Sequence, residues 1–271
     1  MINNSNSCPK RIKAMKLKMF LFIFLLNNSY SIGQLTPPGL GSNSKMNLWF
    51  AIGLDQKLDS AGRFSSMTYF GFAGQSTVDD INVFDRLGIF VLNEEVKFKF
   101  KPAWSVSLAV SYRHQNEFEK NYPYLAAEDR FKQEFRLYSR IMKSWKKKGI
   151  PSIAFRQEYR KFYDPEFRDW KVSSAFRSRL KFQSEFDLVP AKRLSVIAGF
   201  EFLFSTDFEE ASQEWKHFQY GETRLSAVIS YHTKNNKISY NLGYMNDLLH
   251  VPAGEKSVHY ISASVIFKNL F

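Results

Sequence analysis

The chain has 271 residues, and its 38 Lys and Arg against 26 Asp and Glu give a formal net charge of +12. Aromatic residues make up 17% of the chain and charged residues 24%. After residue 33 no stretch approaches the ~18 consecutive apolar residues of a membrane-spanning helix, which excludes a helical membrane protein.

The N-terminal segment 1–33 has the three-part layout of a secretory signal peptide. It is basic and free of acids up to Lys18, continues with the apolar run MFLFIFLL, and ends in small residues before Gln34. A short membrane anchor is the alternative, but so short a run cannot cross ~30 Å of hydrocarbon as a helix. Cleavage removes Cys8, the single cysteine, which excludes disulfides, thiol nucleophiles and cysteine metal sites.

Residues 34–44 contain TPPGLGSNS and are predicted to be a flexible lead-in. From residue 45 onward, apolar and polar residues alternate, most clearly in WSVSLAVSY at 104–112, and this pattern is typical of strands. Most of the candidate strands have 11 residues or more, whereas globular strands average about 5–6 and membrane strands need about 9–11. The candidates lie near 45–58, 64–74, 88–100, 104–116, 131–143, 150–163, 172–186, 194–206, 221–233, 237–247 and 258–271.

Short and long connections alternate between these strands; the long ones carry net negative charge and the short ones net positive charge. Short periplasmic turns and longer extracellular loops are typical of outer-membrane barrels. We therefore predict an all-β fold, an antiparallel transmembrane β-barrel over 45–271 with 10–12 strands, rather than a soluble periplasmic sandwich. Eleven strands can be read from the sequence, but twelve are favoured because single-chain bacterial barrels use even numbers. A missed strand, a wrong assignment, or residues 34–44 threading the lumen would reconcile the two numbers.

The hexads FKQEFR at 131–136 and FRQEYR at 155–160 place charged residues on the face opposite the aromatic ones. In a barrel this predicts a lumen charge ladder, with Arg136 opposite Glu158 and Glu134 opposite Arg160. Such a ladder fills a narrow lumen, because buried charges need partners. Its surplus of cations also supports a conduit for small anions. The ladder comprises Lys132, Glu134, Arg136, Arg140, Arg156, Glu158, Arg160, Arg177, Arg179 and Lys181.

The last strand ends the chain on Phe271, and Phe267 lies on the same alternating face. This resembles the C-terminal signal by which outer-membrane barrels are recognised for assembly. We therefore expect the barrel-assembly machinery to be a partner through this strand.

The sequence offers little for catalysis. His114 lies near Glu117 and Glu119, with Ser111 on the same strand, so a rim lipid hydrolase of the lipid A deacylase or phospholipase type is one hypothesis. The opposite strand parities of Ser111 and His114 count against it. We predict no catalytic residue, metal site or cofactor, and no nucleic-acid partner. The hypothesis that the protein is an enzyme is therefore the less favoured one.

Several segments carry a family resemblance: QLTPPGLGS, SMTYFGF, LNEE, SYRHQNEF, KQEFRLYSR, FRQEYRKFY, FRSRL, GYMNDL and VHYIS. With them the chain resembles the outer-membrane β-barrels of Bacteroidetes catalogued as domain of unknown function 2490, over nearly the whole mature length. The resemblance implies a barrel in the outer membrane of a Gram-negative bacterium, surrounded by lipid and lipopolysaccharide, and implies no reaction. We expect a structural or scaffold role with a largely filled lumen. An anion conduit and a rim hydrolase are the alternatives, and the oligomeric state stays open.

Overall fold

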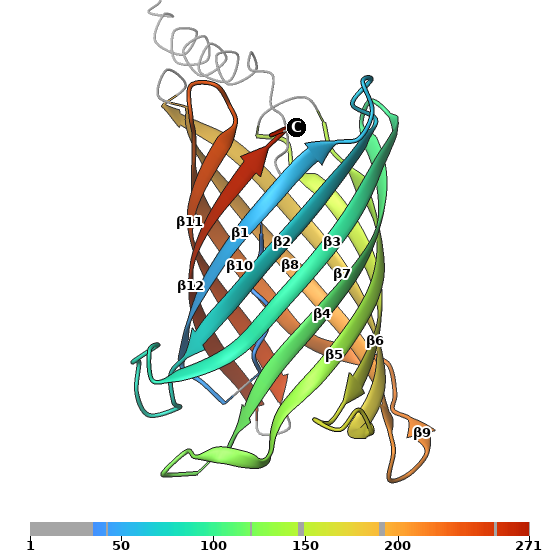
Figure 1. The fold of residues 1–271 in the computed structure, drawn as a ribbon, viewed down its shortest axis with the longest axis vertical. Coiled ribbons are helices and arrows are strands. Elements are labelled where there is room, and N and C mark those ends of the chain that lie inside the picture. Colours follow the sequence, from blue (N-terminus) through green and yellow to red (C-terminus); the bar gives the residue numbers. More distant parts are fainter. Residues whose placement is uncertain are drawn as a thin grey trace, which may run out of the picture.

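The structure is a computed structural model that describes residues 35–41, 43–119, 121–145, 149–189, 193–251 and 254–270. Most of them belong to one sheet of long strands (Figure 1). No described helix is long and apolar enough to cross a membrane. The strands are β1 (Met46–Lys57), β2 (Phe64–Gln75), β3 (Arg86–Lys101), β4 (Trp104–Phe118), β5 (Ala126–Lys143), β6 (Ser152–Tyr163), β7 (Asp169–Val189), β8 (Leu194–Glu209), β9 (Glu214–Trp215), β10 (Gln219–His232), β11 (Ile238–Val251) and β12 (Gly254–Lys268).

The sheet closes on itself to form a barrel. Sequential strands pair antiparallel, β8 pairs with β10, and β1 pairs with β12 in parallel. Eleven long strands make the wall, and the two-residue β9 pairs only with β8. An odd number of wall strands joined by hairpins makes the first and last run in the same direction, so the closing pair must be parallel.

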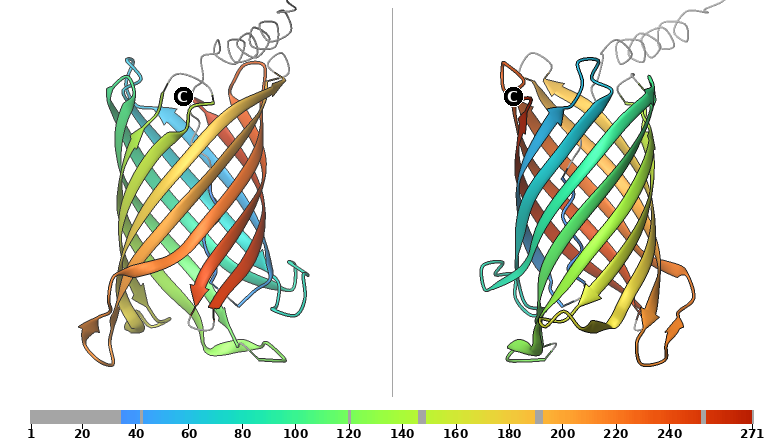
Figure 2. Two further views of the ribbon diagram at one scale, coloured as in Figure 1. Left: turned by 180° about the vertical axis from the view of Figure 1, so that it is seen from behind. Right: turned by 45° about the vertical axis from the view of Figure 1, so that its right-hand side comes forward.

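The extended segment before β1 runs along the inside of the barrel (Figure 2). It passes from the end that carries the short turns to the end that carries the long loops. Leu35 and Leu40 are buried, and the Leu40 N–H donates to the Tyr260 hydroxyl at 2.9 Å. Pro37 and Pro38 remove two N–H donors that would otherwise need partners in the lumen. The chain thus enters β1 at the long-loop end and still begins its described course at the short-turn end.

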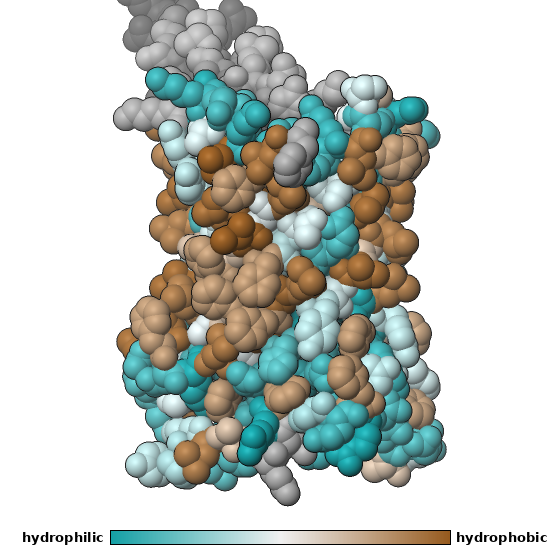
Figure 3. Space-filling view, viewed as in Figure 1, coloured by the Kyte–Doolittle hydropathy of each residue, from teal (hydrophilic) through white to brown (hydrophobic). Residues whose placement is uncertain are grey.

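The outer wall is apolar across its middle and more hydrophilic at both ends (Figure 3). Large apolar side chains such as Leu108, Val110 and Leu242 are 57–58% exposed there. Aromatic pairs flank this band, for example Phe64 with Phe98 near the short turns, at 4.6 Å between ring centroids, and Phe176 with Trp215 near the long loops, at 5.2 Å. An apolar band between aromatic girdles is the outer surface that a membrane barrel requires.

Apolar side chains fill one half of the lumen. The cluster lies along β1, β2, β3, β11 and β12, and Leu35 and Leu40 pack into it. Trp49 is its largest side chain and is 1% exposed. Its ring lies over Gly71, where an added Cβ would come within 2.3 Å of the Trp49 ring carbon Cη2.

Every predicted strand is present, and most extend further into the long-loop end than expected. The barrel prediction is confirmed with the eleven strands read from the sequence. The preference for twelve is wrong, because a parallel closure replaces the extra strand and β9 adds none to the wall. The described residues of the predicted lead-in 34–44, which are 35–41 and 43–44, form the threaded segment. Residues 1–33 and Phe271 lie outside the described residues.

We predict that Gly71→Ala destabilises the barrel by about 1–3 kcal/mol, because the new methyl group overpacks against buried Trp49. Urea unfolding of the protein in detergent micelles measures the effect. Gly221→Ala is the matched control, since the nearest atoms to its added Cβ are 3.9 Å away. Equal unfolding midpoints for both variants would contradict the packing of Trp49 over Gly71.

Candidate functional site

A network of buried ion pairs fills the other half of the lumen. Glu158, 1% exposed, lies at its centre. One of its carboxylate oxygens lies 3.0 Å from Arg136, and the other lies 2.7 Å from Arg156 and 3.1 Å from Arg179. One carboxylate thus faces three guanidinium groups from three adjacent strands. An isolated charge could not be buried there at acceptable cost, so the arrangement depends on all of its members.

Glu134 is a second centre of the same network. It is 2% exposed, and its carboxylate accepts hydrogen bonds from Arg136 at 2.6 Å and from Arg160 at 2.8 Å. Arg136 therefore bridges Glu134 and Glu158, and its ion pair with Glu158 joins β5 to β6.

The network continues around the wall through β7, β8, β10 and β11. Arg179 pairs with Glu201 at 2.6 Å. Arg224 pairs with Glu222 at 2.6 Å and with Asp247 at 3.4 Å. The backbone of the threaded segment passes close to this point, because an added Cβ on Gly39 would lie 2.4 Å from Arg224 Nη2. Only glycine fits there without moving that arginine.

The register between β5 and β6 differs by two residues from the predicted one. Arg136 lies opposite Arg160, and Glu158 lies opposite Tyr138. The ion pairs therefore run diagonally and along one strand, not straight across. A shift of two residues leaves every side chain on the same face, so the alternating pattern predicts the face but not the register.

A cavity of about 730 Å³ lies between this network and the short turns. No described residue of the long loops lines it, whereas the turn residues Gly62 and Asn236 do. We call it the basic chamber. Its lining contains thirteen Lys and Arg side chains and five Asp and Glu side chains, an excess of eight positive charges. The basic residues are Lys57, Lys97, Lys99, Arg113, Arg136, Arg140, Arg156, Arg177, Arg179, Lys181, Arg193, Arg224 and Lys268.

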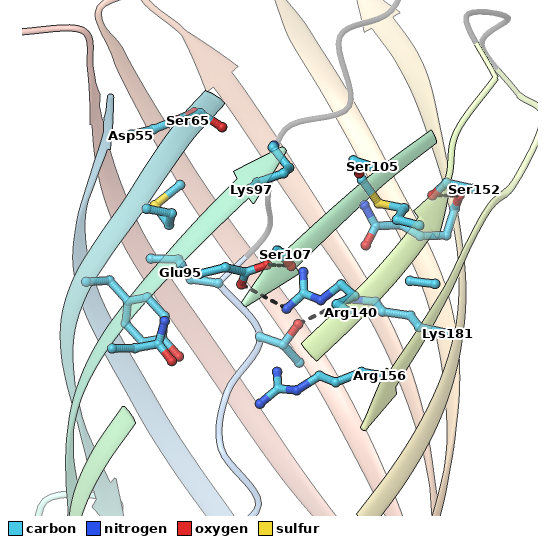
Figure 4. Close-up of a pocket in the computed structure, with 18 of the residues that line it drawn as sticks. Asp55, Ser65, Glu95, Lys97, Ser105, Ser107, Arg140, Ser152, Arg156 and Lys181 are labelled. Atoms are coloured by element: carbon cyan, nitrogen blue, oxygen red, sulfur yellow. Dashed lines mark hydrogen bonds and ion pairs between the residues drawn. The ribbon is translucent and has the colours of Figure 1, made fainter. Parts of the chain in front are cut away.

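Glu95 organises one wall of the chamber (Figure 4). Its carboxylate accepts hydrogen bonds from Ser107 at 2.6 Å, from Tyr138 at 3.0 Å and from Arg140 at 3.1 Å. The Arg156 guanidinium lies over the Tyr138 ring, 3.4 Å from its centroid, in cation–π geometry. These contacts fix two guanidinium groups at the chamber surface.

Other cations of the chamber have weak or neutral partners within the described part of the chain. Lys181 Nζ donates to the Thr36 hydroxyl of the threaded segment at 3.1 Å. Arg177 lies 3.7 Å from Glu222, too far for a hydrogen bond. Positive charge that is poorly neutralised around a polar cavity favours an anionic occupant.

The structure distributes the ten residues of the predicted ladder over three places. Six of its cations, Arg136, Arg140, Arg156, Arg177, Arg179 and Lys181, line the chamber. Glu134, Glu158 and Arg160 lie in the ion-pair network, outside the chamber lining. Lys132 pairs with Glu117 at 2.9 Å.

Sequence reasoning missed several charged members of the lumen. They follow the same strand parity as the ladder, so extending the parity argument to all strands could have found them. They are Glu95, Arg113, Glu201, Glu222, Arg224 and Asp247.

His114 lies on the outer face between two aromatic rings. Its ring centroid is 4.1 Å from that of Phe131 and 6.4 Å from that of Phe90. Glu117 is engaged by Lys132. No described serine forms a hydrogen bond with His114, so the geometry offers the rim hydrolase hypothesis no dyad. Phe267 lies on β12 opposite Leu54 of β1 and Ile238 of β11.

Comparison with known proteins identifies the family of this chain. Residues 46–258 match the family model described as protein of unknown function (DUF2490). The chain belongs to this family. No curated protein matches. Among solved structures, the chain is similar to the anion-selective porin from Comamonas acidovorans, with 10% sequence identity and a TM-score of 0.27 over 78% of this chain. The chain spans 58% of that porin.

We predict that Glu158→Gln destabilises the barrel by about 3–5 kcal/mol, because it leaves three buried guanidinium groups short of a counter-charge. The unfolding free energy in detergent micelles measures it. The control is Glu166→Gln, since Glu166 pairs with an Arg168 side chain that is 73% exposed, and an exposed pair contributes at most about 1 kcal/mol. A small loss for Glu158→Gln would mean that water screens the network.

Proposed function

We propose that this protein is an outer-membrane barrel whose basic chamber binds small anionic solutes from the periplasmic side. Positive charge around the chamber carries the proposal: the lining has an excess of eight, and an excess of five is left when the adjoining Glu134, Glu158, Arg160, Glu222 and Asp247 are counted with it. A purely structural interior would pair its charges, as the network around Glu158 does. The chamber lies directly beside that network and leaves cations facing open volume.

The outer wall and the loops support the proposed location. The apolar band between aromatic girdles suits a bilayer, and the short turns face the periplasm in the usual orientation of such barrels. In that orientation the chamber faces the periplasm, and the long loops face outward beside lipopolysaccharide. The signal-peptide layout predicted for 1–33 and the assembly signal predicted at Phe267 and Phe271 support the same location in a Gram-negative bacterium, with the barrel-assembly machinery as the proposed partner.

The same geometry favours a binding chamber over a free conduit. The threaded segment and the ion-pair network occupy the lumen between the chamber and the long loops. A scaffold with a closed lumen therefore remains part of the proposal. Passage of solutes would require the segment to leave.

We predict that inorganic phosphate or sulfate binds the purified protein and raises its melting temperature at constant ionic strength. The double variant Arg177→Gln/Lys181→Gln should weaken binding by about tenfold or more, because a hydrogen bond to a charged group contributes about 1.5–3 kcal/mol. Calorimetric titration measures the change. Lys132→Gln, which removes a cation outside the chamber lining, should bind normally. Equal binding by all three proteins, or none by the parent, would refute the anion chamber.

We also predict that deleting residues 35–44 converts a silent barrel into an anion-selective pore in planar bilayers. The deletion removes Thr36 from Lys181 and Leu40 from Tyr260, and so opens the lumen along the chamber. Heat-modifiable migration on gels establishes that the variant is folded. A folded deletion variant that does not conduct would show that the ion-pair network alone closes the lumen.

A further inference from the structure

Glu94 lies on the outer wall, inside the apolar band. Strand alternation settles this, because its neighbours Asn93 and Glu95 both lie within hydrogen-bond distance of the Tyr138 hydroxyl inside the lumen, at 3.1 and 3.0 Å. On the outer face Glu94 lies opposite Thr68 of β2 and Val110 of β4. Its carboxyl group therefore points away from the lumen network.

Apart from two hydroxyl groups on β2, the side chains around this carboxyl group are apolar. Along β3 its outward neighbours are Leu92, 53% exposed, and Val96, 40% exposed. The stacked pair of Phe64 and Phe98 lies toward the short turns, and Phe70 and Phe90 lie toward the long loops with ring centroids 6.1 Å apart. Figure 3 shows hydrophilic residues interrupting the apolar band on the face that carries β1 to β3.

Two hydroxyl groups hold the carboxylate in place. Ser66 donates to one oxygen, and Thr68 donates to the other, both from the outer face of β2. An ionised carboxylate can accept about four hydrogen bonds, so roughly half of its capacity stays available toward the membrane. No described basic side chain forms an ion pair with Glu94. A lone carboxylate on a membrane-facing wall is costly and marks a functional site with a partner.

We propose that Glu94, Ser66 and Thr68 form a binding site on the membrane-facing wall for an amphiphile that carries an ammonium group. The carboxylate lacks a counter-charge and a further hydrogen-bond donor, and an ammonium group supplies both. The exposed apolar side chains on either side would hold the alkyl chain. This site rests on the proposed membrane location, but it is independent of the anion chamber inside the barrel.

Labelling with dicyclohexylcarbodiimide tests the site in lipid nanodiscs. This apolar reagent adds to a membrane-accessible carboxyl group, and acyl migration to nitrogen leaves a stable N-acylurea with no leaving group. Glu95 is an internal control, because it is adjacent in sequence but faces the lumen. We expect the label on Glu94 and not on Glu95, as located by fragmentation mass spectrometry.

The ligand class is tested by protection. N,N-Dimethyldodecylamine, whose ammonium keeps one N–H donor and cannot form an amide, should lower Glu94 labelling about fivefold or more, in line with hydrogen bonds in membranes. Dodecanol has the same chain without the charge and should protect little. The double variant Ser66→Ala/Thr68→Val should still be labelled but should lose most of the protection by the amine.

The outcomes separate the two proposals. Equal labelling with and without the amine, or labelling of Glu95 in place of Glu94, overturns the ammonium site while leaving the barrel in its membrane. Failure of the folded protein to enter nanodiscs overturns the membrane location, and the site falls with it. The variant Glu94→Gln, checked by heat-modifiable migration, should lose the label and bind at least fivefold less amine; unchanged amine binding would also refute the site.

Discussion

The interior of this barrel is determined by one constraint: every buried charge needs a partner of opposite charge. Glu158 and Glu134 are almost completely buried, and each engages arginines from neighbouring strands. Removing one member of such a set leaves an uncompensated charge, so the set is kept or lost as a unit. The network therefore limits which residues can occupy the lumen-facing positions of β5 to β8 next to it. The outer face of the same strands carries mainly aromatic and aliphatic side chains, as a wall facing a bilayer would require, since a bilayer would offer no partner for a polar group.

An odd strand number creates a problem of chain direction, and the threaded segment resolves it. With eleven strands, β1 must start at the end where β12 starts, and this is the long-loop end. The segment at 35–44 carries the chain through the lumen to that point. The composition of the segment suits this route. Its two prolines have no backbone N–H donor that would need a partner. Gly39 passes close to Arg224, and Leu40 packs in the apolar cluster. The lumen is accordingly divided between an apolar half that holds the segment and a charged half that faces it.

Alternation along the strands was sufficient to predict the barrel, its strands and the inward face of the two hexads, because these properties depend on side-chain parity alone. The register between strands was not predictable, because a two-residue shift leaves every side chain on the same face and the sequence pattern unchanged. The partners of Arg179 and Arg224 were missed for a related reason. Glu201, Glu222 and Asp247 lie on β8, β10 and β11, and the parity that turns them into the lumen does not say which cation each one pairs with. The chamber follows from three-dimensional placement of turns and side chains that no linear pattern encodes.

Pairing within the network also explains why the chamber is basic. Glu134, Glu158, Glu222 and Asp247 lie outside the chamber lining, whereas their partners Arg136, Arg177, Arg179 and Arg224 line it. The side chains of these arginines therefore reach the chamber wall, whereas the four carboxylates that pair with them lie behind it. A guanidinium has five N–H donors, and one or two carboxylates do not use them all. The network that stabilises the barrel thus places more arginines than carboxylates at the chamber wall. An anion in the chamber would complete their hydrogen bonds without disturbing the pairs beneath.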